Sequence, residues 1–276
     1  MYVVTGATGN VGRPLVRALT GAGERVRAVS RHAPEPDRAD LTDPESLREV
    51  VRGAQGFFLL VSGAGAHLDA PAILDVVKAG GVRRVVLLSS QAAGTRPASP
   101  SHAPLRALED AVRQSGMEWV VLRPGGFASN AFAWAESVRN RRGVAAPFGD
   151  VGLPVVDPGD IAEVAAAALR EPRHTGQVYE LTGPELSTPR QRVAAIADAL
   201  GEAVEFTEQT PAEARRQMLT FMPEPVADGT LDILGRPTAA EVRISPDVQR
   251  VLGRPARGFA GWLGRHLDAF RSPPRH

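Results

Sequence analysis

Three glycines near the start of the chain have the spacing of a phosphate-binding turn. Gly6, Gly9 and Gly12 follow the pattern G-x-x-G-x-x-G. Such a turn needs glycine for a tight bend, for close approach of a ligand to the backbone and for close helix–strand packing. It directs free backbone N–H groups and the positive end of a helix toward one point, which suits a pyrophosphate. The motif predicts dinucleotide binding, and an ordinary glycine-rich turn is the alternative.

The residues around this turn predict a strand before it and a helix after it. The run Tyr2–Val4 is apolar, whereas Val11, Leu15, Val16 and Leu19 recur at helical spacing. A strand, a glycine turn and a helix in this order form the dinucleotide-binding unit. We expect the turn to contact the cofactor through Thr5, Gly6, Thr8, Gly9, Asn10, Val11 and Gly12.

A second chemical signal follows the next predicted strand, at residues 25–30, where the chain reads Ser30-Arg31-His32. A dinucleotide fold places here, about 20 residues after the turn, the group that reads the adenosine ribose. An acidic residue there selects NAD, and an arginine accommodates the 2′-phosphate of NADP. Arg31 offers a planar fork for phosphate. The sequence therefore predicts NADPH rather than NADH, unless Arg31 is only a solvated surface residue.

The rest of the chain keeps alternating strand and helix patterns. Continuous apolar runs at 56–62, 84–89 and 118–122 are typical of central parallel strands. We expect an α/β fold, a Rossmann-type doubly wound parallel sheet with a smaller C-terminal substrate-capping lobe. Residues 1–184 would form the NADP-binding domain, with 127–150 contributing to the substrate pocket, and residues 185–276 the lobe. Other expected elements are a short edge strand at 39–41, a strand at 177–181, helices at 188–200 and 211–219, a strand at 204–207 and a Pro/Gly-rich lid segment at 221–238.

Composition excludes several classes of function. The chain has 276 residues, 43% of them hydrophobic, a net charge of +1 and no cysteine. We therefore expect no disulfides, no thiol chemistry and no general attraction to nucleic acid or to membrane surfaces. The six histidines lack the spacing of metal ligands. No leader precedes the first predicted strand, and we expect a cytoplasmic monomer or homodimer acting on a small-molecule substrate.

A Tyr-x-x-x-Lys pair, in which a tyrosine could donate a proton, is absent from the sequence. Lys78 is the only lysine, and the two tyrosines, Tyr2 and Tyr179, are followed four positions later by Gly6 and Gly183. Any proton donor must therefore be of another kind.

The stretch Thr5–Gly12 resembles the glycine motif of extended and atypical short-chain dehydrogenase/reductases. The resemblance is greatest to the NmrA-like group, which contains NAD(P)H-binding proteins, quinone reductases and nucleotide sensors. It continues through Asp40–Asp43, Ser89–Ser90, Arg123–Phe127, Asn130 and Asp157–Asp160, and weakens after about Pro184.

The resemblance extends the expected cofactor site beyond the turn. It places Asp40 beside the adenine, with a local turn role as the alternative, and Pro124 and Gly125 against the nicotinamide ring. The loop after the 56–62 strand would line the middle of the cofactor, because ligands bind at the carboxyl ends of parallel strands. The further expected contacts are Asp40, Leu41, Val61, Ser62, Gly63, Pro124 and Gly125.

The resemblance also indicates where catalysis would occur. Ser89 and Ser90 fall where the family carries its catalytic hydroxyl, although a serine at a strand end also caps turns. Glu109 matches an acidic residue that lies eight positions after the catalytic tyrosine in relatives. This match puts Ser101 at the tyrosine position and Leu105 at the lysine position. His102 is the candidate proton donor, with a solvated loop histidine as the alternative.

Four residues are expected to face the substrate: Gln91, Phe127, Asn130 and Trp134. Phe127 would form a wall of the pocket. Asn130 has helix capping as its alternative role, and Phe132 and Trp134 have core packing as theirs.

Three functions remain open at this point. The first is an NADPH-dependent reductase of quinones, enones and similar conjugated carbonyls, whose reduced forms need only a weak proton donor. The second is a non-catalytic NADP(H) sensor, which the missing Tyr/Lys pair favours. The third is an isomerase or epimerase that uses the bound cofactor transiently.

Overall fold

The structure is a computed structural model that describes residues 1–61, 65 and 67–272. By packing, the chain divides into two compact units, each made of three stretches. The first unit contains Met1–Pro124, Pro158–Leu181 and Pro246–Pro255, and the second contains Gly125–Asp157, Thr182–Ser245 and Ala256–His276. The functional division expected after residue 184 stays a prediction, because the packing units do not follow a single boundary.

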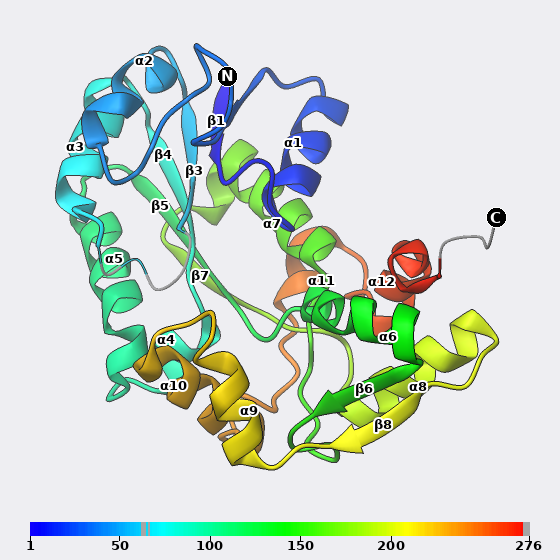
Figure 1. The fold of residues 1–276 in the computed structure, drawn as a ribbon. Coiled ribbons are helices and arrows are strands. Elements are labelled where there is room, and N and C mark those ends of the chain that lie inside the picture. The colour runs from blue at the N-terminus through cyan, green and yellow to red at the C-terminus, as the bar shows by residue number, and fades with distance from the viewer. Residues whose placement is uncertain (62–64, 66, 273–276) are drawn as a thin grey trace. The chain divides into compact units, whose positions relative to one another are not determined.

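The first unit is built on a six-stranded parallel sheet (Figure 1). The strand order is β2-β1-β3-β4-β5-β7, so the chain reverses direction across the sheet between β1 and β3. Tyr2 of β1 pairs with Val26 on one side and with Gly56 on the other. This sheet confirms the predicted Rossmann-type fold. The strands are β1 Tyr2–Thr5, β2 Val26–Val29, β3 Gly56–Leu60, β4 Arg84–Leu88, β5 Glu118–Pro124 and β7 Gln177–Leu181.

Helices cover both faces of this sheet (Figure 1). One face packs against α2 (Leu47–Val51), α3 (Ala70–Ala79) and α5 (Ala103–Gln114), where Phe57 and Leu87 of the strands are fully buried. Helices α1 (Gly12–Gly21) and α7 (Pro158–Arg170) pack against each other on the opposite side. The unit also contains α4 (Gln91–Thr95), α11 (Asp247–Leu252) and the 3-10 turns η1 (Pro44–Ser46), η2 (Pro100–His102) and η4 (Pro172–His174).

The prediction of an edge strand at residues 39–41 is wrong. Residues 39–41 form no strand, and Arg38, just before them, forms an isolated parallel bridge with Ser30. Pro34 and Pro36 precede this segment, and proline lacks the N–H group that a strand ladder needs. The sheet therefore ends at β2, and the polar loop beyond it lies free to border a ligand site.

The second unit has its own apolar core. Phe132 packs edge-on against Trp262 at 4.9 Å and stacks with Phe270 at 6.3 Å. A two-stranded parallel sheet joins β6 (Gly143–Ala146) and β8 (Glu205–Glu208). The helices are η3 Ala128–Trp134, α6 Ala135–Arg141, α8 Pro189–Leu200, α9 Pro211–Met218, α10 Glu224–Gly235, α12 Phe259–Gly264 and η5 Leu267–Phe270.

The sequence predicted part of this unit. Helix α8 begins as expected, because Thr188 accepts a hydrogen bond from the Gln191 backbone N–H in a capping box. Strand β6 and helix α10 were not predicted. Pro225 stands in the first turn of α10, where its missing N–H group costs no hydrogen bond, so a Pro/Gly-rich segment still forms a helix.

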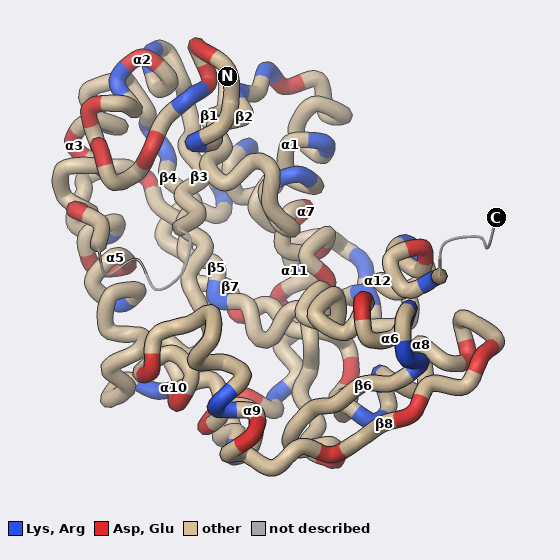
Figure 2. Tube along the Cα trace, viewed as in Figure 1, with Lys and Arg blue, Asp and Glu red and all other residues tan. Residues whose placement is uncertain are grey.

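Figure 2 shows basic and acidic residues interspersed along the chain. In the described ranges, every helix is too short or too polar to cross a bilayer.

Candidate functional site

The site begins where β1 ends. Thr5 is buried, and its Oγ1 atom lies 3.0 Å from the Phe58 carbonyl oxygen and accepts a hydrogen bond from the Leu60 N–H group at 2.9 Å. These bonds fasten the end of β1 to the end of β3. The Thr5 hydroxyl is thus engaged with the neighbouring strand and holds the glycine turn that follows it.

The glycine turn has the geometry that its sequence predicts. Gly6 has a φ of +62°, in the left-handed region that favours glycine. A Cβ atom on Gly12 would lie 2.1 Å from the Gly6 carbonyl oxygen, so only glycine lets α1 begin this close to the turn. At Gly9 a Cβ would lie 3.3 Å from the same oxygen.

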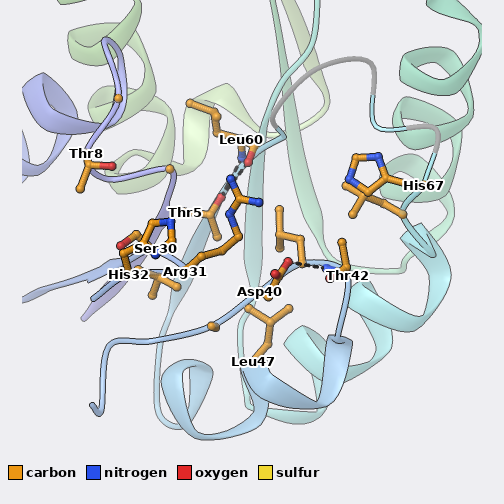
Figure 3. A pocket seen from close by; sticks show the side chains of 16 residues that line it. Thr5, Thr8, Ser30, Arg31, His32, Asp40, Thr42, Leu47, Leu60 and His67 are labelled. Carbon is orange, nitrogen blue, oxygen red and sulfur yellow. Dashed lines mark hydrogen bonds between the residues drawn. The ribbon is translucent and has the colours of Figure 1, made fainter. Parts of the chain in front are cut away.

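A cavity of about 310 Å³ opens above this turn (Figure 3). Its walls come from the carboxyl ends of β1, β2 and β3 and from the segments that follow them. In a doubly wound sheet, this edge at the point of chain reversal is where ligands bind. The cavity is lined by Thr5, Gly6, Thr8, Gly9, Val29, Ser30, Arg31, His32, Ala39, Asp40, Leu41, Thr42, Leu47, Leu60, His67 and Leu68.

Arg31 and Asp40 bring charge into the cavity. Arg31 is exposed and extends into the cavity in Figure 3. The Asp40 carboxylate accepts a hydrogen bond from the Thr42 backbone N–H at 3.0 Å. This bond, with a smaller contribution from the positive charge of Arg31, holds the pKa of Asp40 below its usual value. Asp40 therefore shapes a local turn and also lines the cavity, and its place beside the adenine stays a prediction.

The other expected cofactor residues are spread over both units. Asn10 is exposed, Val11 is buried at the start of α1, and the Val61 side chain packs against the core of the first unit. Pro124 ends β5 in the first unit, whereas Gly125 begins the second. Ser62 and Gly63 lie outside the described residues.

Sequence reasoning missed several residues of the cavity wall. His67 is exposed, and it lines the cavity together with His32 and Leu68. The signal for His32 is its place directly after Arg31 at the end of β2. No comparable local pattern marks His67 or Leu68, because they reach the cavity through the fold.

The expected catalytic residues differ in their surroundings. Ser89 is buried, and its Oγ donates a hydrogen bond to Glu109 Oε1 at 2.6 Å. Ser90 is the N-cap of α4 and accepts a hydrogen bond from the Ala92 backbone N–H at 3.3 Å, which is the capping role considered for it. His102 ends η2, and its Nδ1 lies 2.9 Å from the Ser101 Oγ.

The Ser89 hydroxyl belongs to a buried ionic cluster centred on Glu109. The carboxylate of Glu109, which is 1% exposed, accepts hydrogen bonds from Arg123 at 2.6 and 2.9 Å and from Arg113 at 2.8 Å. Burial alone would raise the pKa of Glu109, but the hydrogen bonds from Arg123 and Ser89 outweigh it and lower the pKa. Glu109 therefore stays ionised. Because the Ser89 proton points at this carboxylate, the Ser89 oxygen can accept a hydrogen bond from a ligand.

The expected substrate residues lie in two places. Gln91 is buried at the start of α4 in the first unit, whereas Phe127, Asn130 and Trp134 belong to the second. Phe127 takes the N-cap position of η3, so the capping role considered for Asn130 is wrong, and Asn130 is exposed inside that helix. Trp134 packs partly against the core of the second unit.

In the part of the chain that the structure describes, no group of histidine and acidic residues could hold a metal ion. The residues instead fit a dinucleotide. The turn carries glycines where a Cβ would clash, the cavity stands at the ligand-binding edge of the sheet, and Arg31 can meet a phosphate there.

Comparison with known proteins agrees with this description. A (4-alkanoyl-5-oxo-2,5-dihydrofuran-3-yl)methyl phosphate reductase of Streptomyces griseus is 35% identical over 98% of this chain and 99% of its own length. An NAD(P)H azoreductase of Xenophilus azovorans is 30% identical, with 98% and 99% of the two chains covered. The Escherichia coli NADPH-dependent quinone oxidoreductase QOR2, solved with NADPH, superposes with a TM-score of 0.77 at 22% identity, over 96% and 99% of the chains. The profile of the NmrA-like family matches residues 2–233, and the chain belongs to that family.

Proposed function

We propose that this protein is an NADPH-dependent reductase that transfers hydride to a conjugated carbonyl compound such as a quinone or an enone. The cavity above the glycine turn, with Arg31 extending into it, is the observation that carries the proposal. Two relatives that are at least 30% identical over nearly the whole chain are named as reductases, which supports the same chemistry. The S. griseus relative is named for a dihydrofuranone substrate that bears a phosphate, and its ring carbonyl is conjugated.

Different residues of the first unit would hold different parts of the cofactor. The backbone N–H groups of the turn at Gly6–Gly12 would face the diphosphate, and Arg31 the 2′-phosphate. Asp40 stays ionised beside the expected adenosine position. When bound, NADPH supplies the hydride that reduces an acceptor by two electrons.

The missing Tyr/Lys pair limits the choice of acceptor. Ser101 stands at the expected tyrosine position and Leu105, which is buried, at the lysine position, so neither supplies a strong acid. A conjugated acceptor yields a reduced form that a weak donor or water can protonate. His102 is the titratable candidate for that proton, and Ser89 would orient a ligand through its oxygen.

The test is anaerobic oxidation of NADPH by the purified protein with a panel of quinones and enones and a simple ketone as control. We expect turnover selective for the conjugated acceptors. If the protein binds NADPH but none of the acceptors causes NADPH oxidation, it would instead be the NADP(H) sensor that the missing Tyr/Lys pair also favours. Exchange of substrate hydrogen without net NADPH consumption would indicate an isomerase.

Arg31 allows a separate test of cofactor choice. Hydrogen bonds to a charged group contribute about 1.5–3 kcal/mol, so Arg31→Ala should weaken NADPH binding roughly ten- to a hundredfold. NADH, which lacks the 2′-phosphate, should bind almost as before. Arg38→Ala is a matched control, because Arg38 is exposed in the same loop and does not line the cavity. Equal weakening of NADPH and NADH by Arg31→Ala would refute this role.

A further inference from the structure

The cavity above the glycine turn is lined by three side chains that can carry a positive charge and by one carboxylate. The three are Arg31, His32 and His67, and the carboxylate belongs to Asp40. The two histidines stand on different segments, because His32 follows β2 and His67 precedes α3. When the imidazoles are protonated, the first unit therefore presents a mainly cationic surface to a ligand in this cavity.

His67 stands on the wall of the cavity that carries the carboxylate. In Figure 3, Asp40 turns its carboxylate toward Thr42, on the side of His67. The Thr42 backbone N–H lowers the pKa of Asp40 most, and the positive charges of Arg31 and His67 add smaller contributions. A positive charge on His67 is therefore partly offset by Asp40.

His32 lies across the cavity from His67, beside the glycine turn (Figure 3). The Ala7 N–H donates a hydrogen bond to the Val29 carbonyl oxygen at 3.4 Å, which joins the turn to the end of β2. The Ala39 N–H donates to the Ser30 carbonyl oxygen, also at 3.4 Å, and fastens the segment that carries His32. The backbone at His32 is thus positioned next to the turn before a ligand binds.

Arg31 and His32 are both available to a ligand anion. Among the residues that the structure describes, neither side chain has a hydrogen bond or an ion pair, and both are exposed. Arg27 of β2, by contrast, lies 3.3 Å from Asp37, and Arg13 of α1 donates to a carbonyl oxygen of the glycine turn at 3.0 Å. The charged and titratable residues on the segments around His32 are Arg13 and Arg17 on α1, Arg27 on β2, Glu35, Asp37 and Arg38 in the loop after β2, and Arg31, Asp40 and His67 in the cavity.

The position of these two side chains indicates the anion. With the diphosphate of a dinucleotide at the glycine turn, the adenosine ribose lies at the end of the second strand. A phosphate monoester at the ribose 2′-oxygen carries nearly two negative charges at pH 7, because its second pKa is about 6. A guanidinium keeps its charge throughout the physiological range, whereas an imidazole changes charge between about pH 5 and 8. Of two such contacts to one phosphate, only the contact from histidine depends on pH.

We propose that His32 is a second ligand of the 2′-phosphate beside Arg31, and that the preference for NADPH over NADH falls as His32 loses its proton. This inference rests on the cofactor site proposed above and adds a specificity-determining residue to it. A protonated imidazole attracts the phosphate, so NADPH binding takes up protons and weakens as the pH rises. NADH has no 2′-phosphate, so its binding does not depend on this contact.

The experiment measures the dissociation constants of NADPH and NADH by calorimetry at about pH 6.5 and about pH 8.5. The phosphate is mostly dianionic at both values, so its own titration has little effect. The preference for NADPH, taken as the Kd of NADH divided by that of NADPH, should fall about fivefold at the higher pH, as expected for an exposed ion pair. This ratio cancels any pH effect that the two cofactors share.

Three variants assign the pH dependence to one histidine. His32→Gln should lower the preference for NADPH at the lower pH and leave it nearly independent of pH. His32→Arg should keep the preference and also remove its pH dependence, because a guanidinium stays charged. His67→Gln is the matched control in the same cavity, and it should affect the two cofactors equally and leave the pH dependence in place.

Proton uptake is a readout that a merely structural role of His32 would not change. Calorimetric titrations in two buffers of different ionisation enthalpy give the number of protons taken up when each cofactor binds. At about pH 7.5 the wild-type protein should take up more protons with NADPH than with NADH. This excess should disappear in His32→Gln and remain in His67→Gln.

These measurements need no turnover, so their outcome is independent of whether the protein reduces an acceptor. A preference for NADPH that does not change with pH, or a pH dependence that His32→Gln leaves intact, overturns the role of His32 and leaves Arg31 as the phosphate ligand. Equal affinity of the wild-type protein for NADPH and NADH at both pH values overturns the 2′-phosphate site as a whole.

Discussion

Glu109 in the first unit and Arg192 in the second are both charged side chains with buried polar atoms, and they differ in their hydrogen-bond partners. Glu109 is 1% exposed and receives hydrogen bonds from Ser89, Arg113 and Arg123. The Arg192 side chain has no such partner among the described residues, and its Nε is buried without a hydrogen bond. A buried charge with a full set of partners is stabilised by the fold, whereas one without them costs free energy.

The Glu109 cluster joins elements that the chain order keeps apart. Glu109 lies on α5, Ser89 directly follows β4, and Arg123 is part of β5. Gly94 of α4 also packs on this cluster, because a Cβ there would lie 2.4 Å from an Arg123 nitrogen. The cluster therefore fixes the segment after β4 that carries the Ser89 oxygen, and its charges are satisfied before any ligand arrives.

The largest expected effect comes from breaking this cluster. Arg123→Gln removes the partner that holds Glu109 with two hydrogen bonds and should destabilise the protein by about 3 kcal/mol, because it leaves a buried carboxylate poorly compensated. The free energy of unfolding in urea measures this loss. Arg113→Gln is the matched control on the same carboxylate, and its effect should be smaller because Arg113 is the more exposed partner. Equal losses from the two variants would show that Arg123 is no more important to the cluster than Arg113.

The pH dependence of stability is the next test. The folded-state pKa of Glu109 is lowered, so its contribution is present above the unfolded pKa of about 4.3 and is lost as the pH falls through the folded value. One such group changes the free energy of unfolding by at most about 1.4 kcal/mol per pH unit. Glu109→Gln should be less stable than the wild type at pH 7 and should lose less stability below about pH 4.3. Parallel acid curves for the two proteins would contradict an ionised Glu109.

The two units also differ in how well their secondary structure could be predicted from the sequence. The first unit was predicted well because its signals are local. Gly6 and Gly12 are required by one tight turn, Arg31 follows one strand, and continuous apolar runs mark central strands. In the second unit, β6 and α10 were not predicted. Strand β6 is short and depends on pairing with β8, and α10 contains Pro225 and Gly229, which are unfavourable in helices.

The candidate site follows the same division. The sequence identified the turn and Arg31 as cavity residues, since each directly follows a strand, and the family resemblance identified Asp40. It could not identify His67 in the cavity, or Arg192 as a cation without a partner, because both properties depend on residues distant in the chain. Arg190 and Arg192 stand two residues apart on one helix, and only the folded structure separates the paired arginine from the unpaired one.

The smallest expected effect is a gain in stability rather than a loss. It tests the comparison between Glu109 and Arg192 most directly. Arg192→Met replaces an uncompensated buried charge with an apolar side chain of similar length, so it should leave stability unchanged or raise it by about 1 kcal/mol. The melting temperature and urea midpoint measure this change. Arg190→Met, the control, removes an ion-paired arginine and should give no gain. If Arg192 served only to support the fold by stacking on Trp134, Arg192→Met would be destabilised and the distinction between satisfied and unsatisfied buried charges would fail.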